Sequence, residues 1–124
     1  MSAPPKEMPE FHELAKADEV ATGEVKQYQV EGRPVALCNV DGELYAFEDI
    51  CTHAFAHLSE GGLEDGQIKC PLHGAKFDVK TGKALTLPAV KAVPTHELKI
   101  EDGVVYVALN EKRVKVGGRR GRGR

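Results

Sequence analysis

Two short pairs of cysteine and histidine stand out in this sequence. The first is Cys51-Thr52-His53, and the second, after a gap of sixteen residues, is Cys70-Pro71-Leu72-His73. Both side chains of a pair can reach one metal centre from a single tight loop. Two thiolates and two imidazoles, divided between two loops, can hold a two-iron, two-sulfur cluster, with the cysteines on one iron and the histidines on the other.

A zinc site is the alternative, because two cysteines and two histidines also bind Zn²⁺ tetrahedrally. Zinc fingers usually pair cysteine with cysteine and histidine with histidine, as C-x-x-C followed by H-x-x-x-H. Both pairs are mixed in this chain, which favours the cluster. A zinc-stabilised interaction module is kept as the hypothesis from another functional class.

The ligand spacing resembles that of the Rieske family, and the resemblance continues through Leu58-Ser59-Glu60-Gly61 and Gly74-Ala75-Lys76-Phe77-Asp78. It covers roughly residues 10 to 108. It implies an all-β Rieske fold, an antiparallel β-sandwich with a small cluster-binding subdomain formed by two loops at about residues 48–85. It also implies one [2Fe-2S] cluster per chain, held by Cys51, His53, Cys70 and His73.

The pattern of residues by itself also reads all-β. Runs rich in Val, Leu, Tyr and Phe are separated by pairs ending in glycine, which supplies the positive φ of tight hairpins. These pairs are Glu31-Gly32, Asp41-Gly42, Asp65-Gly66, Thr81-Gly82 and Asp102-Gly103. We expect strands at residues 11–14, 24–30, 34–40, 43–48, 67–70, 75–78, 95–101 and 104–110, and one helical turn at 18–20.

Size and composition bound the possibilities further. The chain has 124 residues, enough for one domain with a modest core. No run of eighteen apolar residues predicts a transmembrane helix, and the first residues lack the apolar stretch of a signal peptide. We therefore expect a cytoplasmic protein without a membrane partner. The third cysteine, Cys38, is predicted to be a small buried side chain in a strand.

Charge divides the chain in two. Residues 1–109 hold ten basic and eighteen acidic residues, net −8, whereas residues 110–124 hold seven basic and one acidic, net +6. We expect a Rieske domain at 1–109 and a disordered basic tail at 110–124, because Gly and Arg cannot bury enough surface to fold. The tail lacks interleaved aromatic residues, so nucleic acid is not expected as a partner.

Four positions bear on the reduction potential. High-potential members of the family carry a disulfide between the two loops, and a Ser and a Tyr after the second ligand pair. The matching residues here are Ala56 and Leu72 for the disulfide, and Ala75 and Phe77 for the hydroxyls. The resemblance therefore implies a potential near the low end of the Rieske range of about −150 to +300 mV.

In the family the histidine ligands face solvent, so His53 and His73 are the expected electron exit. Phe55, Leu72 and Pro88 are predicted to cover the cluster and form a docking rim. His57 is read as a surface or neighbouring histidine rather than a ligand, and no role is assigned to His12 or His96.

No G-x-G-x-x-G fingerprint is present, and all iron positions have ligands, so we expect an electron carrier and not an enzyme. The chain resembles the ferredoxin component of bacterial aromatic-ring dioxygenase systems. That resemblance implies transient binding to an NAD(P)H-dependent flavoprotein reductase and a terminal non-haem iron oxygenase. The alternative within the family is the small Rieske subunit of an assimilatory nitrite reductase.

Overall fold

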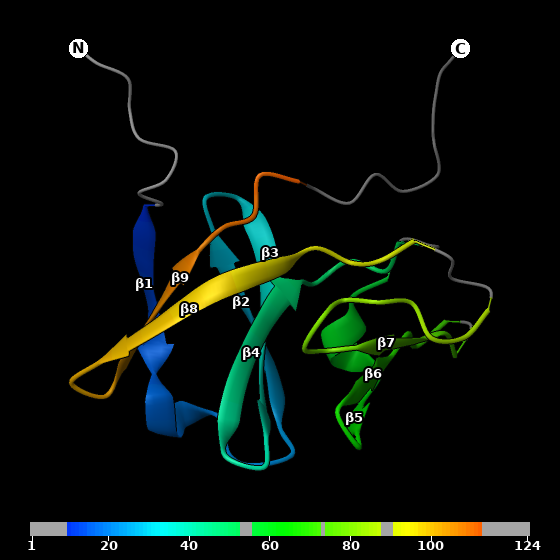
Figure 1. Cartoon of the computed structure of the whole chain (residues 1–124), viewed down its shortest axis with the longest axis horizontal. Helices are drawn as coiled ribbons and strands as arrows, with labels where there is room; N and C mark the ends of the chain where they lie inside the picture. Colours follow the sequence, from blue (N-terminus) through cyan, green and yellow to red (C-terminus); the bar gives the residue numbers. More distant parts are fainter. Residues whose placement is uncertain (1–9, 53–55, 73, 88–90, 113–124) are drawn as a thin grey trace.

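The computed structural model describes residues 10–52, 56–72, 74–87 and 91–112. Antiparallel strands dominate it, with two single turns of 3₁₀ helix (Figure 1). The strands are β1 (Phe11–Lys16), β2 (Val25–Val30), β3 (Arg33–Val40), β4 (Glu43–Glu48), β5 (Leu63–Glu64), β6 (Gln67–Lys69), β7 (Lys76–Asp78), β8 (Thr95–Glu101) and β9 (Val104–Ala108). The 3₁₀ turns are η1 (Ala17–Glu19) and η2 (Leu58–Glu60).

The strands form a larger and a smaller sheet. Six of them pair in the order β1-β9-β8-β4-β3-β2, and the other three in the order β5-β6-β7. Only two residue pairs, Ala46–His96 and Phe47–Thr95, join β4 to β8. The larger sheet therefore consists of two three-stranded halves, and a shared core lies between them. The all-β prediction of two stacked antiparallel layers is confirmed.

Four of the five predicted turn pairs connect neighbouring strands. In Glu31-Gly32, Asp41-Gly42, Asp65-Gly66 and Asp102-Gly103 both residues have positive φ. Each loop is two residues long, so these are type I′ turns, whose twist matches that of the strands. The fifth pair, Thr81-Gly82, lies in the long connection after β7. There a Cβ on Gly82 would come within 2.0 Å of the Val93 carbonyl oxygen.

Strand β3 is buried on both faces, because it is the wall between two hydrophobic cores. Val35 and Leu37 pack into the core of the larger sheet. Ala36 and Cys38 point the opposite way, into a second core beneath the smaller sheet. A strand with two buried faces reads as a continuous apolar run. The burial predicted for Cys38 is confirmed, and it raises the pKa of this thiol to about 12.

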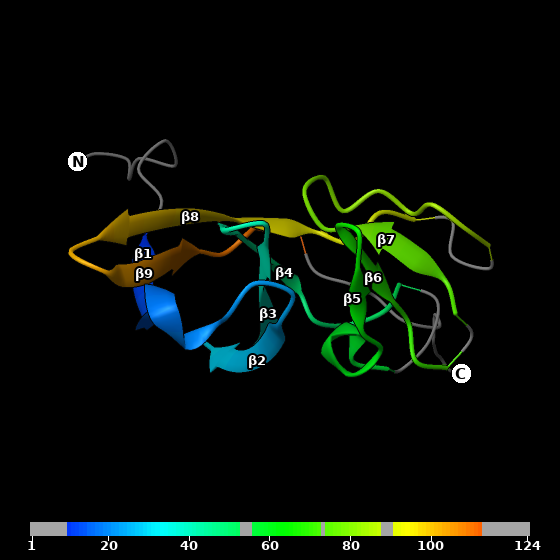
Figure 2. The same ribbon diagram turned by 90° about the horizontal axis from the view of Figure 1, so that it is seen from below.

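The smaller sheet belongs to a subdomain inserted between β4 and β8 (Figure 2). The chain leaves the larger sheet after Glu48 and re-enters it at Thr95. At this neck the Glu48 N–H donates to the Pro94 carbonyl (2.9 Å). The insertion lies between Glu48 and Thr95, and a cluster-binding subdomain at about residues 48–85 stays a prediction.

The observed elements agree closely with the expected ones, apart from strand ends and two additions. Strand β5 and turn η2 were not predicted, because two or three residues are too few to show a period. The expected helical turn is η1, shifted by one residue. Among the described residues, no helix has the length and apolar character needed to cross a membrane.

Candidate iron–sulfur site

Cys51 and Cys70 each begin a loop of the subdomain. Both side chains are fully buried, and both belong to the core beneath the smaller sheet. The Cys51 N–H donates to the carbonyl of Ala56 (2.9 Å), and the Cys70 N–H donates to the carbonyl of Ala75 (2.7 Å). Each loop is thus closed by the same bond, from the cysteine to the residue five positions later. Two loops of one construction present one cysteine each.

A further hydrogen bond supports each loop. The Thr52 hydroxyl donates to the Lys91 carbonyl (2.8 Å), which joins the first loop to the segment that returns to β8. In the second loop the Gly74 N–H donates to the Cys70 carbonyl (2.9 Å). Gly74 has φ +77°, a conformation that favours glycine at this point of the Gly74-Ala75-Lys76-Phe77-Asp78 motif.

Gly61 explains the glycine of the Leu58-Ser59-Glu60-Gly61 motif. Its backbone lies directly against β6, and a Cβ at this position would stand 1.5 Å from the Lys69 carbonyl oxygen. No side chain fits there without moving β6. Because Cys70 follows Lys69, this close approach ties the end of the first ligand segment to the start of the second.

The structure also places the residues expected around the cluster. Ala75 and Phe77 are fully buried next to Cys70 in the core, and neither carries a hydroxyl. Leu72 is 58% exposed, and Ala56 packs against the core. His53, Phe55, His73 and Pro88 lie outside the described residues.

Sequence reasoning missed Asp49, a buried carboxylate two residues before Cys51. It accepts hydrogen bonds from the Gln27 amide (2.7 Å) and from both the backbone N–H (2.6 Å) and the hydroxyl of Ser59. His57 covers this group, half-exposed, with Nδ1 3.0 Å from the Asp49 carbonyl oxygen and from Gln27 Nε2. The only sequence signal was two consecutive acidic residues, Glu48-Asp49, between an apolar strand and a ligand.

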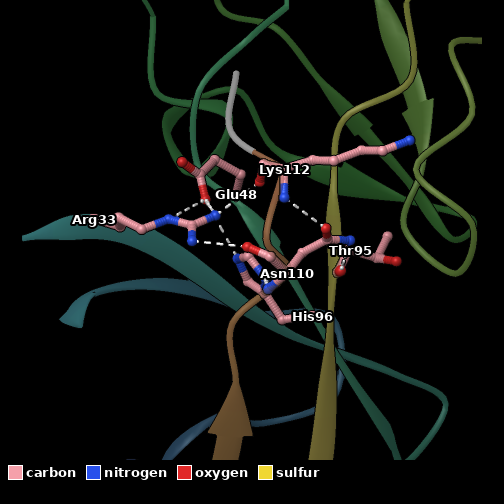
Figure 3. A network of polar contacts seen from close by, with 6 residues as sticks. All are labelled: Arg33, Glu48, Thr95, His96, Asn110 and Lys112. Carbon is pink, nitrogen blue, oxygen red and sulfur yellow. Dashed lines mark hydrogen bonds and ion pairs between the residues drawn. The ribbon is translucent and has the colours of Figure 1, made fainter. Parts of the chain in front are cut away.

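A second buried polar group, also missed, lies at the neck (Figure 3). The Arg33 guanidinium donates to Glu48 Oε1 through Nη2 (2.7 Å) and Nε (3.2 Å), and both side chains are almost fully buried. Arg33 also donates to the carbonyls of Asn110 (2.8 Å) and Lys112 (3.0 Å). Residues 110–112, which the sequence analysis placed in the tail, are therefore bound to the folded domain.

His96, to which the sequence analysis gave no role, completes this group. Its Nδ1 accepts a hydrogen bond from the Asn110 N–H (3.0 Å), so the ring proton is on Nε2, 3.4 Å from Glu48 Oε1. Burial alone would raise the pKa of Glu48. The Arg33 hydrogen bonds and charge, together with the nearby His96 ring N–H, outweigh that effect and lower the pKa.

Comparison with known proteins agrees with this geometry. The Rieske [2Fe-2S] domain family matches residues 10–97. The ferredoxin component of the naphthalene 1,2-dioxygenase/salicylate 5-hydroxylase systems of Ralstonia sp. is 44% identical over 97 residues, which are 78% of this chain and 93% of the relative. The ferredoxin component of biphenyl 2,3-dioxygenase of Rhodococcus jostii is 43% identical over 96 residues, 77% of this chain and 90% of the relative.

Solved structures show the same architecture. The ferredoxin of carbazole 1,9a-dioxygenase from Nocardioides aromaticivorans superposes with a TM-score of 0.77 at 29% identity, over 81% of this chain and 98% of that chain. A ferredoxin chain similar to this one, with TM-score 0.75 and 35% identity over 79% and 92% of the two chains, comes from a complex of reduced oxygenase and oxidised ferredoxin in carbazole 1,9a-dioxygenase.

The chain belongs to the Rieske [2Fe-2S] family. Within that family it is a ferredoxin, an electron-transfer component rather than a catalytic enzyme. The donor set fits the cofactor, because two buried cysteines begin two loops of matching construction and each is followed by a histidine in the sequence. The chain therefore carries one [2Fe-2S] cluster, and the zinc hypothesis is set aside.

Proposed function

We propose that this ferredoxin accepts single electrons from an NAD(P)H-dependent flavoprotein reductase in the cytoplasm and delivers them to a terminal non-haem iron oxygenase that attacks an aromatic ring. The observation that carries the proposal is the pair of matching loops that begin at Cys51 and Cys70. Relatives that are ferredoxin components of naphthalene and biphenyl dioxygenase systems support it. No feature of the described residues favours a nitrite reductase subunit.

In this proposal Cys51 and Cys70 hold one iron, while His53 and His73 hold the other. The bound cluster would supply reversible one-electron chemistry, with His53 and His73 on the iron that would be reduced because imidazoles bring no thiolate charge. The chain's own part is to hold both loops rigidly, since electron transfer needs a fixed distance to the partner. The bonds that close the loops, from Cys51 to Ala56 and from Cys70 to Ala75, perform this task.

The contact surface is proposed to be the exposed apolar side chains of the subdomain. Leu72, Leu85 and Leu87 are 58%, 40% and 78% exposed, and all lie in loops of the subdomain. They extend the rim expected from Phe55, Leu72 and Pro88. Apolar contacts that release easily suit a carrier that must bind two partners in turn. The fourth large exposed apolar residue of the described chain, Ile100, lies near the opposite end, on β8.

Charge is distributed differently from the apolar residues. Residues 10–50 hold three basic and ten acidic residues, net −7, whereas residues 51–87 hold four of each and are neutral. The negative charge of the body therefore lies mostly on the larger sheet, away from the proposed contact. It attracts a basic partner from a distance, so the association rate should fall as ionic strength rises.

Two matched variants test the contact surface. Leu87→Asp should slow reduction by the reductase and delivery to the oxygenase by about tenfold, since one buried charge at an interface costs at least about 1.4 kcal/mol. Ile100→Asp should leave both rates unchanged. Stopped-flow reduction of the cluster measures each rate, and both variants should keep the wild-type spectrum and midpoint potential. Equal slowing by the two variants would remove the subdomain loops as the contact.

The basic tail is tested by ending the chain after Lys112, because Arg33 binds the carbonyl of that residue. Spectrum and midpoint should stay unchanged, and partner reduction should not weaken. Residues 113–124 carry six basic side chains and no acidic ones. Their positive charge is opposite in sign to the negative charge of the body. Ferredoxin-dependent turnover against ionic strength provides the comparison. If turnover collapses at every salt concentration, the tail itself is a docking element.

A further inference from the structure

The starting observation is the complete burial of the Asp49 carboxylate. A carboxylate is removed from water only at considerable cost, so its hydrogen bonds must replace those lost to solvent. Asp49 receives three: from the Ser59 N–H, the Ser59 hydroxyl and the Gln27 side-chain amide. Its backbone N–H also donates to the carbonyl of Pro34 (2.9 Å), which fixes the main chain at this point.

These bonds enclose the first ligand loop. The bond from Cys51 to Ala56 closes an inner ring. The two bonds between Asp49 and Ser59 close an outer ring, with one member on each side of the loop. Gln27 belongs to β2, so the same carboxylate fastens both ends of the ligand loop to the larger sheet.

The charge of Asp49 is not cancelled by these contacts. Its three donors belong to neutral groups. Among the described residues, the single ion-pair partner of Asp49 is His57, at 3.8 Å, and only when that ring is protonated. Two residues span at most about 7 Å of extended chain, so the α-carbons of Asp49 and Cys51 lie within about that distance of each other. Inside a protein such a charge is screened much less than at the surface.

We propose that Asp49 is a positioning residue for the first ligand loop and that its uncompensated charge lowers the reduction potential of the cluster. This inference rests on the ligand set proposed above. The oxidised cluster with two thiolates has a formal charge of zero, from two ferric ions, two sulfides and two thiolates. One electron from a partner makes it −1. A buried negative charge nearby opposes that step and leaves the oxidised form unaffected.

The charge is tested by Asp49→Asn in the cluster-loaded protein, with Glu60→Gln as the matched control. Both substitutions remove one negative charge within the same segment, but Glu60 is exposed. For Asp49→Asn we expect the equilibrium constant for one-electron reduction to rise about tenfold, which is about 59 mV. Protein-film voltammetry at low and high salt measures it. The shift should persist in salt, whereas the Glu60→Gln midpoint should stay near wild type.

The positioning role is tested separately by Ser59→Ala, which keeps the charge and removes one donor. We expect faster loss of visible absorbance in a chelator, with a midpoint that does not rise. If the Asp49→Asn protein does not take up the cluster, Ser59→Ala still tests the positioning role. A Ser59→Ala protein that keeps its cluster as long as wild type would overturn the positioning role. An unchanged Asp49→Asn midpoint, or equal shifts in Asp49→Asn and Glu60→Gln, would overturn the charge effect. A wild-type protein that binds zinc and no iron would instead refute the ligand set itself.

Discussion

Replacing Arg33 by Met should destabilise the domain severely. Arg33 and Glu48 are 9% and 2% exposed at their side chains, so solvent screens their interaction little. Removing one partner of a buried pair costs about 3–5 kcal/mol, because the other charge stays buried without compensation. The variant also loses the bonds to the carbonyls of Asn110 and Lys112. For a domain of about 100 residues, 3 kcal/mol corresponds to a fall of at least about 12 °C in Tm.

The assay is thermal unfolding followed by circular dichroism and visible absorbance at one fixed scan rate, since cluster loss makes unfolding irreversible. Lys99→Met is the control, because Lys99 forms an exposed pair with Glu101 at 3.9 Å, worth about 1 kcal/mol or less. The double variant of Arg33→Met and Glu48→Gln should recover part of the loss. A fall in Tm no larger than that of the control would refute the reasoning.

The deficit should also depend on pH. In the wild type the pKa of Glu48 is lowered, so its contribution to stability is present above the ordinary glutamate pKa of about 4.3 and is lost as pH falls through the folded-state value. Without Arg33, burial raises that pKa relative to wild type. The Tm difference should therefore be largest near neutral pH and shrink below about pH 4. A difference that is constant with pH would show that the loss is not electrostatic.

Three further outcomes follow from the packing of the subdomain. Gly61→Ala should prevent cluster assembly, because its Cβ would overlap the backbone of β6. Gly62 faces open space, so Gly62→Ala should bind the cluster and lose only about 1–3 kcal/mol of folding stability through its positive φ. Iron and sulfide content distinguishes the two variants. Cys38 should resist alkylation at pH 8 until the protein is unfolded in urea, because its pKa is about 12; mass spectrometry records the adduct. Ala75→Ser and Phe77→Tyr should each raise the midpoint from a wild-type value near −150 mV, and a wild-type midpoint above zero in voltammetry would refute the account of the missing hydroxyls.

Most of the fold was readable because its signals are local. A type I′ turn depends on two adjacent residues, so three strand pairs followed from pairs such as Asp41-Gly42 and Asp102-Gly103. The double burial of β3 corresponds to the unbroken apolar run at 35–38, from which only the burial of Cys38 had been predicted. The ligand pairs were predicted from spacing alone, since only one or two residues separate each cysteine from its histidine in the sequence. The structure describes the two cysteines and adds the matched hydrogen bonds that close their loops.

What could not be read depends on residues that are distant in sequence. Arg33, Glu48, His96 and Asn110 meet at the neck only because β3, β4, β8 and the segment after β9 converge there. Each looks like an ordinary polar residue in its own surroundings. Asp49 was missed for the same reason, because its partner Gln27 comes from β2, 22 residues earlier. Burial of a charged side chain is a property of the tertiary structure and leaves almost no trace in a single sequence.

The double burial of β3 limits how the subdomain can be transferred between proteins. Its entry and exit lie side by side, where Phe47 pairs with Thr95, so its ends look suitable for excision or for grafting onto another scaffold. Yet its floor is the outer face of β3, formed by Ala36 and Cys38. Removing the insert would expose that face to water, and a transplanted insert would lack the β3 surface against which its core packs. The cluster module can therefore be exchanged only together with the strand beneath it, and we expect chimaeras that respect this boundary to be the ones that load iron.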